Sequence, residues 1–175
     1  MKLDQIRFQK IRLFYEAGFS APLVLKKNAS LAPWELYQRI YSRSERSFFL
    51  DSLHSLLPTE RYSYMGWRPY LGVFFKEGRL WTEGAVRQTK ERPDLLKELR
   101  RFFSSVRVPP EFSFECFAGG AVGYFGYELA QEFDRISLRP KKGLRVPSLA
   151  LLFFRDLIVF DHKRGDYYLI SWALR

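Results

Sequence analysis

Polar side chains with complementary chemistry stand at the ends of two apolar segments. Asp51 and Ser52 follow the apolar residues 48–50, and Arg61, Tyr62 and Ser63 begin another segment nine positions after Ser52. If these segments pair as strands, they bring together a carboxylate, hydroxyl groups, an aromatic ring and a guanidinium. This set suits a zwitterionic amino acid, because the carboxylate can bind its ammonium group and the donors its carboxylate. The same residues also fit a strand-end cap or a surface salt bridge.

Residues 117–127 are rich in glycine and in aromatic residues. Gly120, Gly123 and Gly126 are spaced three apart, which matches neither a dinucleotide fingerprint nor a P-loop. The aromatic alternation hints at an RNA-recognition strand, but the leading Lys or Arg of that motif is missing. We therefore interpret this segment as a tightly packed turn from a strand into a helix.

The remaining reactive residues do not form a catalytic set. Asp161 and His162 follow an apolar strand, but no nucleophile accompanies them, and we predict a turn with a half-exposed histidine there. Cys116 is the single cysteine, so no disulfide is possible within the chain. Carboxylates are not clustered at ligand spacing. We expect no catalytic residues, no metal site and no cofactor in this chain.

Composition indicates a folding chain with an excess of positive charge. Of its 175 residues, 47% are hydrophobic and 18% aromatic, which is unlike a disordered chain. The length fits one domain or a fragment of a larger one. The net charge of +10 raises a nucleic-acid-binding module as an alternative, especially because residues 135–145 carry five basic residues and no acid. A solvated loop that keeps the protein soluble explains the same run.

We expect a reducing, cytoplasmic setting. Residues 1–5 have no apolar core of the kind that a secretory signal needs. The longest apolar run, residues 149–154, is far shorter than the roughly 20 residues that span a bilayer.

The pattern of apolar residues and turn residues predicts an α+β fold. Residues 8–16 fit a strand or a helix, and helices are expected at 33–44, 93–104 and 127–133. Strands are expected at 47–53, 61–66, 70–75, 79–82, 148–159 and 166–172, and loops at 106–111 and 136–147. Because strands and helices do not alternate strictly, we predict a mostly antiparallel sheet or β-sandwich with a few helices packed on it.

Four of these segments, taken in order, resemble the N-terminal region of the large subunits of anthranilate synthase and aminodeoxychorismate synthase. Residues 49–52 (FLDS) stand where the family carries a Leu-Leu-Glu-Ser-like motif, and residues 61–66 (RYSYMG) are similar to its Arg-Tyr-Ser-Phe-Ile-Gly segment. Residues 119–128 resemble its Gly-Gly-x-x-Gly-Tyr-x-x-Tyr-Asp signature, and residues 156–162 resemble the strand that closes the region. The resemblance covers roughly residues 48–172.

The resemblance implies a role within a larger enzyme of two regions. The full enzymes combine chorismate with ammonia from a glutamine amidotransferase subunit and require Mg²⁺. Their catalytic residues lie in a C-terminal chorismate-binding region, which this chain lacks. Residues 1–175 would then be a single N-terminal domain, not catalytic alone, that serves as a scaffold.

The resemblance also implies an effector site for tryptophan. Carried over by position, this pocket uses Leu50, Asp51, Ser52, Arg61 and Tyr62. Asp51 replaces the family's longer Glu, which shortens the reach of the carboxylate by one methylene. A stand-alone amino-acid-binding protein is a further alternative.

Overall fold

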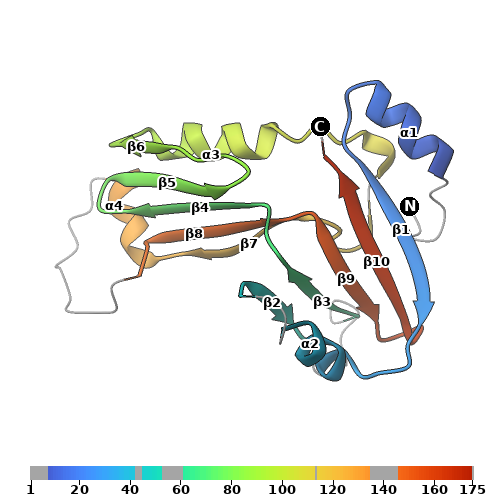
Figure 1. The fold of residues 1–175 in the computed structure, drawn as a ribbon. Coiled ribbons are helices and arrows are strands. Elements are labelled where there is room, and N and C mark those ends of the chain that lie inside the picture. The colour runs from blue at the N-terminus through green and yellow to red at the C-terminus, as the bar shows by residue number, and fades with distance from the viewer. Residues whose placement is uncertain (1–7, 42–44, 53–60, 113, 135–145, 175) are drawn as a thin grey trace. The chain divides into compact units, whose positions relative to one another are not determined.

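Ten strands in the described part of the chain form two antiparallel five-stranded sheets (Figure 1). The structure is a computed structural model that describes residues 8–41, 45–52, 61–112, 114–134 and 146–174. Together with four α-helices in the same ranges, the sheets confirm the predicted α+β class and its antiparallel character.

The chain divides into two compact units. Unit 1 comprises Met1–Pro69, Ser105–Gly120 and Phe154–Arg175, and unit 2 comprises Tyr70–Ser104 and Ala121–Phe153. Each unit contains one of the two sheets, and each is described here by itself.

The sheet of unit 1 has the strand order β1-β10-β9-β3-β2. Its strands are β1 (Ala21–Asn28), β2 (Ser47–Leu50), β3 (Tyr62–Trp67), β9 (Asp156–Asp161) and β10 (Asp166–Ala173). Since β3 pairs with both β2 and β9, it brings the segment after β2 and the turn after β9 to the same end of the sheet. This register positions the candidate site.

Two helices and a short 3₁₀ turn pack on the unit 1 sheet. The helix α2 (Pro33–Tyr41) places Tyr37 and Ile40 against the buried Met65, as its apolar spacing predicts. The helix α1 (Phe8–Glu16) contacts β1, and Ile11 forms a small core with Phe112 of the 3₁₀ turn η2 (Pro110–Phe112). Residues 8–16 are thus a helix, which resolves the ambiguity of their pattern.

The sheet of unit 2 has the order β6-β5-β4-β8-β7. Its strands are β4 (Leu71–Lys76), β5 (Arg79–Gly84), β6 (Thr89–Glu91), β7 (Gly120–Phe125) and β8 (Leu149–Phe154). The helix α3 (Leu95–Ser104) covers one face, where Leu95, Leu99 and Phe102 pack with Val73 and Leu80 (Figure 1). The predicted helix after the glycine-rich segment is present as the 3₁₀ turn η3 (Tyr127–Leu129) and the helix α4 (Ala130–Phe133).

A two-residue turn closes the hairpin between β4 and β5. Lys76 pairs with Arg79, and the residues between them, Glu77 and Gly78, have φ values of 50° and 76°. Two successive positive φ values define a type I′ turn, whose twist matches that of the flanking strands. The Glu77-Gly78 pair therefore closes a hairpin between two of the predicted strands.

One predicted strand is wrong. Residues 148–159 were expected to form one strand, but the chain leaves β8 at Phe154 and begins β9 at Asp156, so it passes from one sheet to the other. Arg155 between them is exposed, and its carbonyl accepts a hydrogen bond from the Trp172 amide. The hairpin partner of β10 is therefore β9 alone.

We expect Asp94→Ala to lower the free energy of unfolding by about 1 kcal/mol, because Asp94 caps α3. Its carboxylate accepts a hydrogen bond from the Lys97 amide at 3.0 Å, and its carbonyl accepts one from the Glu98 amide at 3.0 Å. Urea denaturation of parent and variant measures the difference. The matched control is Glu45→Ala, which removes an exposed carboxylate outside the helices; an equal loss in both variants would contradict the cap.

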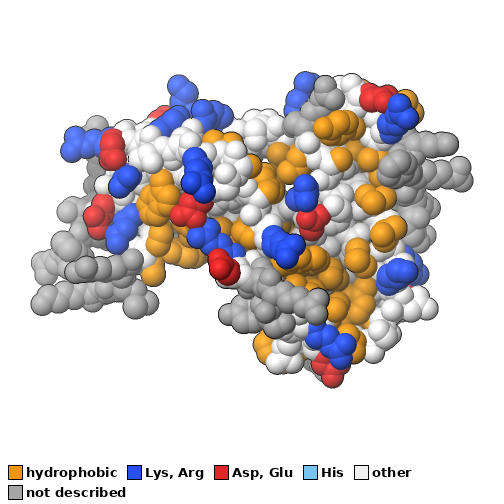
Figure 2. Space-filling view, viewed as in Figure 1, with side chains coloured by type: hydrophobic (Ala, Val, Ile, Leu, Met, Phe, Trp, Pro, Cys, Tyr) orange, Lys and Arg blue, Asp and Glu red, His pale blue; other side chains and the backbone are white. Residues whose placement is uncertain are grey.

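The basic side chains of the described residues do not gather into one patch on the face drawn in Figure 2, where Lys and Arg alternate with hydrophobic and uncharged side chains. The basic run at residues 135–145 lies outside the described residues. Among the described helices, none has the length and apolar character to cross a membrane.

Candidate functional site

The five predicted effector residues lie where β2 ends and β3 begins, in unit 1. Leu50 is the last residue of β2, pairs with Tyr64 and is 49% exposed. Asp51 is exposed and Ser52 half-buried directly after it. Arg61 and Tyr62 stand at the start of β3 on the neighbouring strand. The pairing of β2 with β3 therefore brings both halves of the predicted set to one end of the sheet.

A buried serine, Ser63, connects the segment that follows β2 to the turn after β9. The Ser63 hydroxyl, with the residue 0% exposed, donates a hydrogen bond to the Asp51 carboxylate at 2.7 Å. It accepts one from the Ser52 amide at 3.0 Å and lies 2.7 Å from His162 Nε2. Asp51, Ser52, Ser63 and His162 thus form one hydrogen-bond network, which we call the Ser63 network.

Arg61 forms an ion pair with Asp161. Its Nε lies 2.9 Å from Asp161 Oδ1, and its Nη2 binds Oδ2, so the planar fork contacts both carboxylate oxygens. Asp161 is 1% exposed and also accepts a hydrogen bond from the Lys163 amide at 3.0 Å. The donor fork that we expected to bind a ligand carboxylate is therefore engaged within the protein.

Burial and charge perturb several groups around this ion pair. Burial alone would raise the pKa of Asp161, but the hydrogen bond and charge of Arg61 hold that pKa below its ordinary value. Burial raises the pKa of Tyr62 to about 12, although the Arg61 guanidinium, 4.8 Å from the ring centre, opposes the shift. Burial also raises the pKa of Cys116 to about 11, so its thiol stays protonated at neutral pH.

The Ser63 network contains a serine, a histidine and an aspartate, but its order excludes a nucleophilic triad. In a triad the histidine lies between the carboxylate and the serine, and it takes the serine proton. Here the serine lies between the other two and donates its proton to the carboxylate. Because Ser63 is also fully buried, the network fixes structure and does not activate a nucleophile.

Asp161 and His162 were absent from the predicted set, whereas Ser63 follows Arg61 and Tyr62 in it. Ser63 alternates with the buried Met65 along β3, and a buried hydroxyl requires partners. The turn predicted at residues 161–165 is confirmed by hydrogen bonds from the Arg164 and Gly165 amides to the Asp161 carbonyl. His162 is exposed there, but its ring is bound to Ser63.

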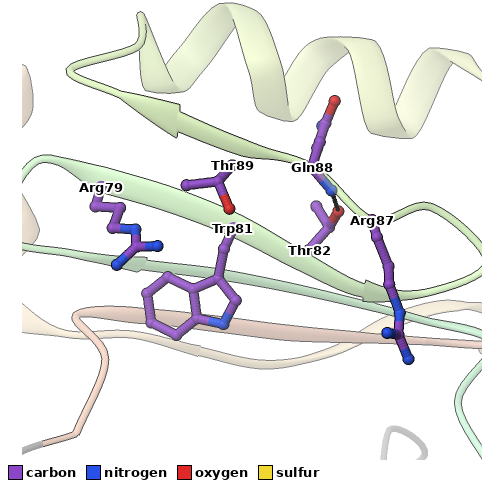
Figure 3. A pocket seen from close by; sticks show the side chains of 6 residues that line it. All are labelled: Arg79, Trp81, Thr82, Arg87, Gln88 and Thr89. Carbon is purple, nitrogen blue, oxygen red and sulfur yellow. Dashed lines mark hydrogen bonds between the residues drawn. The ribbon is translucent and has the colours of Figure 1, made fainter.

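A separate pocket lies in unit 2 and contains none of the predicted residues. Trp81, Arg79, Arg87 and Thr89 line it together with Thr82 and Gln88 (Figure 3). The Trp81 ring stacks on Phe74 with their centres 5.4 Å apart, and Arg79 pairs with Glu91 at 3.4 Å. In the ranges that the structure describes, no group of three or more His, Cys, Asp or Glu side chains could hold a metal ion.

The chain is similar in sequence to component 1 proteins of anthranilate synthase and of aminodeoxychorismate synthase. Anthranilate synthase component 1 of Methanothermobacter thermautotrophicus is 33% identical over 140 residues, which is 79% of this chain and 28% of that protein. Aminodeoxychorismate synthase component 1 of Bacillus subtilis is 26% identical over 111 residues, 63% of this chain and 24% of that protein. No protein-family model matches the chain.

A solved structure shows the same fold. Anthranilate synthase component I from Streptococcus pneumoniae superposes with a TM-score of 0.55 at 24% identity, covering 82% of this chain and 30% of that one. The chain therefore spans about a third or less of the proteins it matches. These relatives favour the synthase interpretation over a nucleic-acid-binding module or a stand-alone amino-acid-binding protein. The chain is a homologue of the N-terminal part of the component 1 proteins of anthranilate synthase and aminodeoxychorismate synthase.

Proposed function

We propose that this chain is the N-terminal scaffold and effector-binding region of an enzyme that aminates chorismate with glutamine-derived ammonia. The product would be anthranilate or 4-amino-4-deoxychorismate. The observation that carries the proposal is the 33% identity to an anthranilate synthase component 1 over 79% of the chain. The pneumococcal component I has the same fold over 82% of this chain.

The chemistry itself would belong to other parts of the complete enzyme. A C-terminal chorismate-binding region would hold the substrate and Mg²⁺, and a glutamine amidotransferase subunit would supply ammonia. This chain's own residues would bind an effector and support the catalytic region. Its described residues bring a carboxylate and hydroxyl groups together at one sheet end.

The effector site would be formed by Leu50, Asp51, Ser52, Arg61 and Tyr62, and tryptophan fits their chemistry. The exposed Asp51 carboxylate can bind the ammonium group of an amino acid. Leu50, 49% exposed, and the Tyr62 ring supply apolar contact for an indole. Arg61 supports the site indirectly, because its fork binds Asp161 and its charge lies against the Tyr62 ring.

The test is a calorimetric titration of L-tryptophan into the 175-residue chain and into the same chain joined to the C-terminal region that its relatives carry. We expect Ser52→Ala to weaken binding by about 0.5–1.5 kcal/mol, the net scale of one hydrogen bond. Asp51→Ala should weaken it by about 1.5–3 kcal/mol, because it removes the charged partner of the ammonium group.

Glu45→Ala is the matched control, since it removes an exposed acid just before the other end of β2. Its tryptophan affinity should equal that of the parent. Equal affinity of the parent, Asp51→Ala and Ser52→Ala in both proteins would place the effector elsewhere or show that there is none.

A further inference from the structure

The cavity of unit 2, which we call the Trp81 pocket, lies on the face of the sheet that α3 does not cover. Leu80 of β5 packs with α3, so its neighbours Arg79 and Trp81 point to the opposite face. Figure 3 shows the side chains of Arg79, Trp81 and Arg87 extending away from α3. The cavity volume is about 580 Å³, which is within the usual range for small-molecule sites.

A row of side chains across three strands leaves space beside the Trp81 ring. Phe74 of β4 pairs with Trp81 of β5, and Trp81 pairs with Thr89 of β6, the edge strand. The Phe74 and Trp81 rings stack, with centres 5.4 Å apart and planes 20° apart. The third member of the row, Thr89, is smaller than an indole ring and lines the cavity next to it. A planar ligand above Thr89 would therefore continue the aromatic stack.

Two guanidinium groups line the same cavity, and they differ in how far their charge is already compensated. Arg79 pairs with Glu91 at 3.4 Å, in a contact where both side chains are more than half exposed. Arg87 is exposed, and among the described residues it has no ion-pair partner. A guanidinium presents a planar fork of donors that matches a carboxylate. The uncompensated fork and the stacking ring together favour a ligand that is both aromatic and anionic.

The loop that carries Arg87 is held in place by the buried Thr82. The Thr82 hydroxyl donates a hydrogen bond to the Val86 carbonyl at 2.7 Å and accepts one from the Gln88 amide at 3.0 Å. The Thr82 amide also donates to the Gln88 carbonyl at 3.0 Å. These bonds fix the residues on both sides of Arg87. Its backbone is thus ordered without a ligand, which lowers the entropic cost of binding one.

We propose that the Trp81 pocket binds an aromatic carboxylate, whose ring stacks on Trp81 and whose carboxylate is bound by Arg87. Arg79 contributes less, because Glu91 already compensates its charge. The pocket shares no residue with the candidate effector site of unit 1, so this proposal does not depend on the proposed function.

The experiment titrates the 175-residue chain with 2-naphthoate and follows the indole N–H signals of its four tryptophans by NMR. The Trp81 signal should shift, whereas those of Trp34, Trp67 and Trp172 should not. Two analogues separate the two contacts. 2-Naphthalenemethanol keeps the rings without the charge and should bind about tenfold more weakly, the scale of a charged hydrogen bond. Decahydro-2-naphthoate keeps the charge without the flat rings and should bind about fivefold more weakly.

Variants of the two arginines test the carboxylate contact. Arg87→Ala should weaken 2-naphthoate binding about tenfold, and Arg87→Lys about threefold, because lysine keeps the charge but lacks the fork. Glu91→Gln releases Arg79 from its ion pair and should tighten binding about twofold. The matched control is Arg100→Ala, which removes an exposed arginine of α3 outside the cavity and should leave the affinity unchanged.

Trp81→Ala should abolish the stacking contact and weaken binding about tenfold. Because Arg87 is exposed in a loop, its variants remain informative even if Trp81→Ala does not fold. Equal losses in Arg87→Ala and Arg100→Ala would mean that a basic surface attracts any anion, which would overturn the site. A Trp81 signal that does not move would overturn it as well, and equally tight binding of 2-naphthalenemethanol would overturn the assignment of a carboxylate ligand.

Discussion

Gly123→Val is expected to lower the free energy of unfolding by about 3 kcal/mol or more, at the severe end of point mutations. A Cβ built on Gly123 would lie 1.8 Å from the Ala150 carbonyl oxygen and 2.9 Å from Leu151 Cα. Both are backbone atoms of β8, so no side-chain rotation can relieve the clash. Strand β7 would have to move away from β8. Thermal and urea denaturation of the purified chain measure the loss.

Gly120→Val tests whether a loss of stability at a glycine comes from a steric clash or from the backbone conformation. A Cβ at Gly120 would meet only the Phe117 ring, at 3.5 Å, which is ordinary contact. Its φ of 127° still disfavours any side chain, so we expect a smaller loss of about 1–3 kcal/mol from backbone strain. Ala173→Val, at an exposed strand position, is the control and should change stability by less than about 0.5 kcal/mol. Equal melting of Gly123→Val and this control would contradict the close approach of β7 to β8.

The sequence predicts tight packing of the glycine-rich segment but not its conformation, because residues 120–125 form the strand β7 and only Gly126 leads into the helical turn η3. Tight packing is confirmed at Gly123, where the neighbouring strand leaves no room for a side chain. At Gly120 the requirement is a backbone angle, which spacing cannot reveal. A glycine pattern alone does not distinguish contact with a neighbouring strand from local conformation, because the partner strand is 27 residues away along the chain, at Ala150.

The passage of the chain from one sheet to the other at Arg155 could not be predicted from the sequence, for a similar reason. Residues 149–154 and 157–160 are both apolar, and only Arg155 and Asp156 interrupt them. An interruption of two polar residues also fits a single strand with one exposed edge. The decisive information is long-range: β8 pairs with β4, whereas β9 pairs with β3 and β10. The local pattern of apolar residues does not indicate which strand will pair with a given segment.

For the candidate site, the sequence predicts that two segments adjoin, but it assigns one role that the structure does not show. Asp51, Ser52, Arg61 and Tyr62 stand at the same end of the sheet, where β2 ends and β3 begins. The partner of Arg61 could not be foreseen, since Asp161 is 100 residues away along the chain. The spacing that joined Ser52 to Arg61 therefore predicts proximity, but not which carboxylate the guanidinium binds.

Asp161→Asn is expected to lower the free energy of unfolding by about 3 kcal/mol at neutral pH. Asp161 is 1% exposed, and breaking a buried ion pair leaves the remaining charge poorly solvated, at a cost of roughly 3–5 kcal/mol. The Arg61 side chain is 25% exposed, so water can offset part of that cost, and we place the loss at the lower end. Asparagine keeps one carbonyl oxygen for the Lys163 amide, so the turn itself should persist.

Glu115→Gln provides the matched control for charge. Glu115 lies 3.7 Å from Nη1 of the same Arg61, but its side chain is 63% exposed. An exposed pair of this kind contributes about 0–1 kcal/mol. The two variants thus make the same chemical change on opposite sides of one guanidinium. If Asp161→Asn melts at the same temperature as Glu115→Gln, the buried ion pair does not stabilise the fold more than the exposed one.

The pH dependence gives an independent signature of the same ion pair. Because Arg61 holds the pKa of Asp161 below its ordinary value, the folded state binds this proton more weakly than the unfolded state does. The stabilisation is therefore complete above the ordinary aspartate pKa of about 3.9, and it is lost as the pH falls below that value. Asparagine has no such proton to take up. The difference in unfolding free energy between parent and Asp161→Asn should accordingly be constant from pH 8 to pH 5 and shrink below pH 4. A difference that persists unchanged at pH 3 would assign the loss to packing and not to charge.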